Sequence, residues 1–294
     1  MDEKFEEILK SDGGPFIRKL LEYEKKRVDK FNIEIKKREP NIFEQMNIDF
    51  GIFPEEVCYP VYFHGDLMKP KNKIVIIGIN PGKESTNEEK CEYCEYLNEE
   101  KGLFEQYCNI FINCFKDKPK KDMQYFYNIY KFFSTFKKEK TEFSTILKNV
   151  NFINDKKEII PDWEWFQENI INLEIIPYHS KNVNGLNINN LEHYKKRYLE
   201  PLLKIINHIK PKLPILINGY PTSRQHFESE ILGKFFVKEK GLIYFKGKGK
   251  QKDKTITVGK IDDYKFYGLP FLSHFSAKYF NSIAKAISKN YEKI

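Results

Sequence analysis

The chain has 294 residues, of which 40% are hydrophobic and 15% aromatic, so it can bury a large core and general disorder is excluded. The formal net charge of +8 favours a polyanionic partner, although an AT-rich genome would produce the same lysine excess. The charged N-terminal segment and the absence of an apolar run of about 18 residues predict a cytoplasmic protein without a membrane span.

The N-terminal part of the chain is expected to be helical. Phe5, Ile8 and Leu9 have helical spacing, residues 11–15 break the pattern, and a second helix is predicted from Phe16 to about Lys37. We therefore divide the chain into a helical extension, residues 1–60, and a main α/β domain, residues 61–294.

Four short apolar runs, each ending in a polar loop, are typical of buried strands. Predicted helices lie between and after them, at Leu191–Ile209 and Ala277–Tyr291, and this alternation predicts a mostly parallel sheet with helices on both faces. A ligand is then expected at the carboxyl ends of the strands. The lysine-rich segment 244–260 is expected to be a hairpin with a basic tip or a mobile loop. The predicted strands are 73–79, 173–176, 214–217 and 269–272.

The loop after the first of these strands superficially resembles a nucleotide-binding P-loop. That motif needs a glycine where this chain has Ile77, and serine or threonine where it has Glu84. The pattern therefore fails at both ends, and no nucleotide cofactor is expected.

The same loop, Gly78-Ile79-Asn80-Pro81-Gly82, resembles the first active-site motif of the uracil-DNA glycosylase superfamily. It is most similar to the mismatch-specific and single-strand-selective branches, whose motif carries asparagine. Residues 273–277, Ser-His-Phe-Ser-Ala, resemble the second motif, except that Phe275 and Ala277 replace its two prolines. The resemblance implies a three-layer α/β/α fold with a mostly parallel central sheet.

The resemblance also implies an activity, the hydrolysis of the bond between a flipped base and deoxyribose to leave an abasic site. His274 would donate a hydrogen bond to the departing base, and Asn80 would hold the attacking water. DNA is the implied partner and uracil the default target. A bulky modified base of invading phage DNA, or a non-catalytic reader of DNA or modified bases on the same fold, are the alternatives.

The remaining site residues implied by the resemblance fall into two groups. Those expected to contact the base are Gly78, Ile79, Pro81, Tyr93, Phe104, Tyr178, His179, Ser180 and Asn218. Tyr96 competes with Tyr93 and Phe104 for the stacking role. Those expected to contact the DNA backbone are Gly82, Lys83, Ser276, Lys278 and Tyr279.

Each of these residues also has a simpler interpretation. Asn80 could form a turn beside Pro81, His274 and His179 could be core histidines, and Tyr93 and Phe104 could be plain core residues. Metal ligation by Cys91, Cys94, Cys108 and Cys114 is disfavoured, because their spacing does not form two compact pairs and buried cysteine often behaves as a small hydrophobe. We expect no metal, no cofactor and no lysine nucleophile. The lysine-rich stretches 116–121, 137–140 and 246–254 could follow phosphates or simply be solvated.

Overall fold

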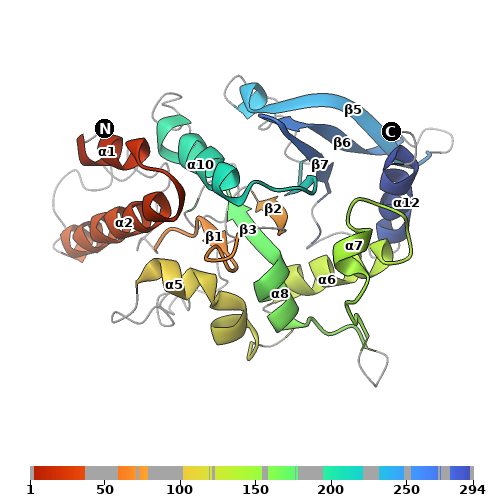
Figure 1. The fold of residues 1–294 in the computed structure, drawn as a ribbon, viewed down its shortest axis with the longest axis horizontal. Helices are drawn as coiled ribbons and strands as arrows, with labels where there is room; N and C mark the ends of the chain where they lie inside the picture. Colours follow the sequence, from red (N-terminus) through yellow and green to blue (C-terminus); the bar gives the residue numbers. More distant parts are fainter. Residues whose placement is uncertain are drawn as a thin grey trace. The chain divides into compact units, whose positions relative to one another are not determined.

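A computed structural model gives the protein a mixed α/β fold, whose strands follow the order β1-β3-β2-β4-β7-β6-β5 in a seven-stranded sheet (Figure 1). The chain divides into two compact units, each made of three segments, which are described separately. Unit 1 comprises Met1–Lys71, Gly78–Ile110 and Ile171–Lys210, and unit 2 the rest. The structure describes residues 3–36, 59–70, 73–78, 102–118, 120, 123–153, 158–175, 177, 195–220, 232–247, 253–270, 272 and 279–291.

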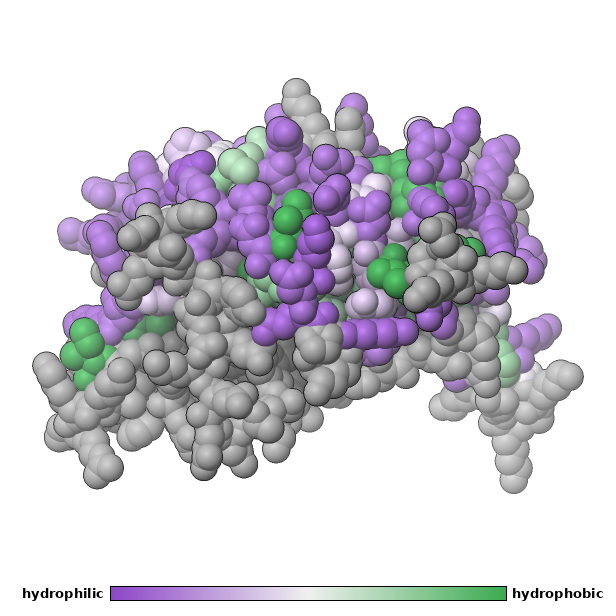
Figure 2. All heavy atoms as spheres, turned by 90° about the horizontal axis from the view of Figure 1, so that it is seen from below, coloured by the Kyte–Doolittle hydropathy of each residue, from purple (hydrophilic) through white to green (hydrophobic). Residues whose placement is uncertain are grey.

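Charged and polar side chains cover most of the coloured part of the face in Figure 2, and hydrophobic ones form small separate groups. The large apolar side chains that are exposed are dispersed along the sequence, from Ile33 to Tyr291. Among the helices that the structure describes, none has the length and apolar character needed to cross a membrane.

Two helices begin unit 1, as the sequence predicted. α1 (Glu3–Lys10) buries Phe5 and Ile8, and α2 (Gly13–Lys36) buries an apolar stripe that includes Phe16, Ile17, Leu20 and Leu21. This spacing of one helical face explains why both segments are helical. The break between them is supported by Gly13, whose φ of 64° lies in the left-handed region that glycine adopts without strain.

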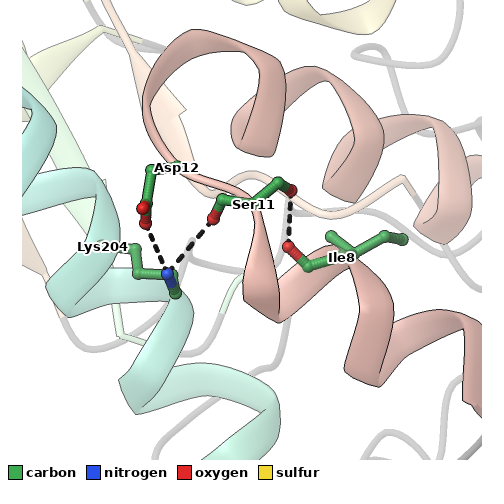
Figure 3. A network of polar contacts seen from close by, with 4 residues as sticks. All are labelled: Ile8, Ser11, Asp12 and Lys204. Atoms are coloured by element: carbon green, nitrogen blue, oxygen red, sulfur yellow. Dashed lines mark hydrogen bonds and ion pairs between the residues drawn. The ribbon is translucent and has the colours of Figure 1, made fainter.

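The break is held against a third helix of the same unit, α10 (Glu200–Ile209), which follows the π-helical turn η3 (Lys195–Leu199). Lys204 Nζ donates to Asp12 Oδ1 at 2.7 Å and to the Ser11 carbonyl at 3.2 Å (Figure 3). Ser11 Oγ in turn donates to the Ile8 carbonyl at 2.7 Å, which satisfies one of the free carbonyls at the end of α1.

A buried ion pair joins α2 to η3. Arg197 Nη2 lies 2.7 Å from Glu24 Oε1, and the two side chains are only 3% and 0% exposed. The Arg197 guanidinium also lies 4.7 Å from the centroid of the Phe5 ring. A buried charge that loses its partner is strongly destabilising, so this pair fixes η3 against α2.

The strands of unit 1 form an antiparallel pair, β1 (Phe63–His64) with β3 (Ile170–Glu174). His64 lies opposite Asn172 in the register. The Phe63 ring packs on α5 (Leu103–Cys108), with centroids 5.8 Å from both Phe104 and Tyr107.

Unit 2 contains three of the four predicted strands in parallel, but the sheet is mixed rather than mostly parallel, since the other described strand pairs are antiparallel. β4 (Ile215–Asn218) pairs in parallel with β2 (Ile74–Gly78) and with β7 (Tyr264–Leu269). Of the two alternatives for residues 244–260, the structure has the hairpin, although its first strand begins earlier and residues 248–252 lie outside the described residues. After the short helix η4 (Leu232–Lys234), β5 (Phe236–Phe245) pairs antiparallel with β6 (Lys254–Ile261), and β6 pairs antiparallel with β7.

Two predicted strands were misplaced. The last one was expected at 269–272 but ends at Leu269, because Pro270 follows and has no N–H for a ladder hydrogen bond. The second was expected at 173–176, whereas β3 begins at Ile170, directly after α8 (Trp163–Asn169). The apolar runs located both strands only approximately. For β7 the reason is that the strand begins with the half-buried polar residues Tyr264 and Lys265, which are not part of an apolar run.

Aromatic side chains fill the helical part of unit 2. η1 (Phe111–Phe115), α6 (Gln124–Phe136) and α8 meet around Phe126, whose ring centroid lies 5.2 Å from that of Phe111 and 5.0 Å from that of Phe115. α7 (Ser144–Leu147) buries Leu147, and α12 (Phe280–Tyr291) packs Phe280 on Phe132 at 5.4 Å. Core packing therefore uses much of the chain's high aromatic content. The division at residue 60 stays a prediction.

The Glu24–Arg197 pair gives a stability prediction. Arg197→Met should lower the free energy of unfolding by about 3 kcal/mol, because it leaves Glu24 buried with a weaker partner. Lys196→Met is the matched control, since Lys196 and Glu6 form an ion pair that is 43% and 41% exposed. This control should cost under about 1 kcal/mol in urea denaturation. Equal losses in the two variants would contradict the assigned role of the buried pair.

Candidate active site

The first feature of the site is an edge where three parallel strands end. Ile77 of β2 lies opposite Ile217 of β4, and Asn218 lies opposite Leu269 of β7. Because the three strands run in the same direction, their carboxyl ends lie along one edge. The chain therefore enters the first motif from β2 and approaches the second motif from β7, with β4 between them.

Asn218, at the end of β4, fixes the segment that leads to the second motif. Its Oδ1 accepts a hydrogen bond from the Leu272 amide at 2.9 Å, and Asn128 Nδ2 donates to the Leu272 carbonyl at 2.8 Å. Leu272 lies two residues before His274 and is 1% exposed. Asn218 was expected to contact the base, and that role stays a prediction; in this structure its amide oxygen holds the backbone before His274.

A second group of residues lies in unit 1, where the first motif begins. A Cβ placed on Gly78 would lie 2.8 Å from Glu174 Oε1 and 2.9 Å from Glu174 Cδ, closer than real contacts allow. The Ile175 amide also donates to the Gly78 carbonyl at 3.0 Å. The end of β3 thus lies against the first residue of the motif, and any side chain at position 78 would have to displace the carboxyl of Glu174.

The carboxyl of Glu174 is buried, with the residue 7% exposed. Its Oε1 accepts from Asn172 Nδ2 at 2.9 Å, whereas Oε2 has no hydrogen-bond partner within the part of the chain that the structure describes. Burial raises the pKa of Glu174 to about 8, and the Asn172 hydrogen bond offsets only part of that rise. At neutral pH the group is therefore mainly an uncharged carboxylic acid.

Glu174 belongs to a row of polar side chains on one face of β1 and β3. Asn172 and Glu174 are two residues apart on the strand, so they point to the same face, and His64 lies opposite Asn172. The His64 ring lies 6.4 Å from the Tyr107 ring, and Tyr107 donates its hydroxyl to the Pro60 carbonyl at 2.9 Å. A neutral acid in such a row can donate a hydrogen bond or exchange a proton near neutral pH.

Most of the residues assigned from the motifs lie outside the described residues. These are Ile79, Asn80, Pro81, Gly82, Lys83, Tyr93, Tyr178, His179, Ser180, His274, Ser276 and Lys278. The described members of the set are Gly78, Phe104, Asn218 and Tyr279.

Phe104 lies on α5 and is 4% exposed. The Arg18 guanidinium lies 4.1 Å from its ring centroid, and Arg18 forms an ion pair with Glu105. Packing on Arg18 and Phe63 accounts for Phe104 without a bound base, so its stacking role stays a prediction.

Tyr279, at the start of the last helix, is half-buried. Its ring lies 6.1 Å from the Tyr244 ring and 5.8 Å from the Phe245 ring, and Lys254 Nζ is 4.7 Å from its centroid. An aromatic residue next to lysine has the chemistry expected for a DNA contact.

Two of the cysteines are described, Cys108 and Cys114, and both side chains are buried. Burial raises the pKa of Cys108 to about 11, which disfavours the thiolate that a metal would need. No group of three or more metal-ligating side chains occurs in the described ranges. Cys91 and Cys94 lie outside them, and metal independence stays a prediction.

The motif search did not identify Glu174. Its signal in the sequence was a single acidic residue within the apolar run Ile170–Ile176. Glutamate is almost never fully buried unless it has a partner, so an acidic residue within a predicted buried strand indicates a special position. The proximity of Glu174 to Gly78 could not be predicted, because it depends on which strands are neighbours.

Comparisons with protein-family models, with curated proteins and with solved structures found no match. The likeness to uracil-DNA glycosylases therefore depends on the motif residues and on where their strands end.

The contact between Gly78 and Glu174 can be tested by a double-mutant cycle. Gly78→Ala should cost about 1–3 kcal/mol, because the added methyl group meets a buried carboxyl. In a Glu174→Ala background the same change should cost much less. Gly14→Ala is the control, since nothing lies within 4 Å of the added Cβ, and it should not destabilise the protein. Additive losses in chemical denaturation would show that the two positions are not in contact.

The pKa of Glu174 predicts how stability depends on pH. The folded-state pKa is about 8 and the usual value is 4.5, so the contribution to stability is complete below about pH 4.5 and is lost as the pH rises to about 8. Glu174→Gln should remove this dependence, by about 1.4 kcal/mol for each unit of pKa shift. Urea denaturation across this pH range measures it, with the exposed Glu164→Gln as control. Parallel pH profiles for wild type and Glu174→Gln would contradict the assignment.

Proposed function

We propose that the protein is a monofunctional DNA glycosylase with a three-layer fold of the uracil-DNA glycosylase type. The observation that supports this proposal is the shared edge of β2, β4 and β7, because the two motif segments follow β2 and β7 in the sequence. In α/β sheets, ligands bind outside the carboxyl ends of the strands. The proposal therefore expects a ligand outside the carboxyl ends of β2, β4 and β7.

In the proposed reaction the target base leaves the helical stack before the chemistry begins. Asn80 orients a water below C1′ of the deoxyribose but cannot deprotonate it, so an easily lost base or a slow reaction is expected. His274 donates a hydrogen bond to the base as negative charge develops on it. Tyr93 or Phe104 would stack on the base, and residues 178–180 would contact its edge.

Glu174 fits this proposal through its protonation state. It lies beside Gly78, the first residue of the motif that carries Asn80, and burial favours its uncharged form. An ionised carboxylate there would repel a departing base that carries negative charge. A neutral acid avoids this repulsion at pH 7.

The activity is tested by incubating the protein with labelled oligonucleotides that contain uracil, a mismatched base or a bulky modified pyrimidine. Alkali cleaves the strand at any abasic site. Wild type should yield a product on at least one substrate, and Asn80→Ala and His274→Ala should each reduce the rate by about a hundredfold or more.

Glu164→Gln, remote from the motifs in the sequence, is the control and should match wild type. Tight binding without product on every substrate would refute the glycosylase for these bases and favour a DNA reader. Full activity in both motif variants would refute the assigned site.

A further inference from the structure

The positive charge of the chain is concentrated in one part of unit 2. Nine lysines and two acidic residues between positions 234 and 260 give this segment a formal charge of +7, against +8 for the whole chain. The segment contains β5, β6 and the loop between them. The proposed enzyme uses none of it, so its charge needs a separate explanation.

An aromatic cluster lies at the loop end of this hairpin. The register of β5 on β6 shifts between Ile243 and Phe245, so Tyr244 is an extra residue in the pairing. Such bulges redirect side chains, and here the Tyr244 and Phe245 rings both contact Tyr279, with centroids 6.1 Å and 5.8 Å from it. Two successive residues of one strand thereby contribute to one cluster.

A lysine completes the cluster. Lys254 lies opposite Phe245, and its Nζ is 5.7 Å from the Phe245 centroid and 4.7 Å from the Tyr279 centroid. A lysine held by two rings keeps its ammonium group at a defined place. We call Tyr244, Phe245, Lys254 and Tyr279 the hairpin cluster.

The hairpin cluster is accessible to a partner. All four of its side chains are half-buried and so partly accessible, and Lys246, next in the chain, is exposed. Further along β5, Lys238 and Lys240 are exposed, and Ile243 is 54% exposed. An ordinary solvated lysine-rich surface does not present clustered aromatic rings. The accessible rings beside several cations therefore distinguish this surface from one that is only solvated.

We propose that the hairpin cluster binds a single strand of DNA, with bases stacked on its rings and phosphates contacted by Lys254, Lys246 and the lysines of β5. Charge complementarity selects a polyanion, and the rings select unstacked bases, since every base offers a face for stacking. The choice of DNA over RNA rests on the proposed function. The inference adds a strand-binding surface that shares only Tyr279 with the residues assigned from the motifs.

Fluorescence anisotropy with labelled, unmodified oligothymidylate tests the surface, because this strand contains no base to excise. Phe245→Leu and Tyr279→Leu should each weaken binding about tenfold through lost stacking. Lys254→Met should weaken binding and lower the slope of log affinity against log salt by about 0.7. Thermal unfolding of each variant checks that it is folded.

The controls lie on α12, away from its start. Tyr291→Leu removes a ring that is 38% exposed, and Lys285→Met removes an exposed charge, and both should bind as wild type does. Unchanged affinity in the cluster variants, or equal losses in the controls, overturns the inference. Equal binding of duplex DNA with equal losses overturns the preference for a single strand. Excision is assayed separately, so a missing abasic product counts only against the glycosylase.

Discussion

The close approach of the Glu174 carboxyl to Gly78, which leaves little room for a Cβ there, is the constraint on which the beginning of the first motif depends. It decides the residue type at the end of β2, and it places an acid where burial disfavours its charge. An apolar side chain at position 174 would cost less to bury, because a buried carboxyl oxygen that has no partner among the described residues loses the hydrogen bonds it makes in water. Polar groups kept at such a cost are concentrated at functional sites, which is why Glu174 belongs with the candidate site although no motif contains it.

The shared strand edge and the hydrogen bonds to Leu272 both restrict the positions of the backbone that leads to the motifs. Catalytic side chains must be positioned to within a fraction of an ångström. Backbone at the end of a strand is more rigid than a free loop and positions them better. Asn218 extends the rigidity of β4 to the backbone before His274 through a single amide–carbonyl hydrogen bond. Asn128 holds the opposite side of the same residue, so Leu272 is fixed from two elements of unit 2. If the proposed chemistry is correct, these two asparagines are positioning residues for it.

The sequence predicted those parts of the fold that depend on local patterns. Helical spacing identified α1 and α2, β-branched runs identified β2 and β4, and the Gly- and Lys-rich segment identified the hairpin. It misplaced β7, because a strand with polar residues at its start does not form a continuous apolar run. It could not give the proximity of Glu174 to Gly78 or the meeting of Tyr244 with Tyr279, since strand neighbours and a register shift depend on the whole fold. The motifs themselves came from resemblance, and their residues remain predictions.

The interleaving of the two units has a consequence for the order in which they can form during synthesis. Every segment of unit 1 has been made once the ribosome passes Lys210, whereas unit 2 still lacks everything from Pro211 to the last helix. The nascent chain can therefore bury the Glu24–Arg197 pair while β2 still has no parallel partner strand. Until β4 emerges, the unpaired edge of β2 must be kept from pairing with other chains. A chain that is released early, with synthesis ended within the basic hairpin, would carry all of unit 1 but an incomplete sheet in unit 2, and we expect such a chain to aggregate.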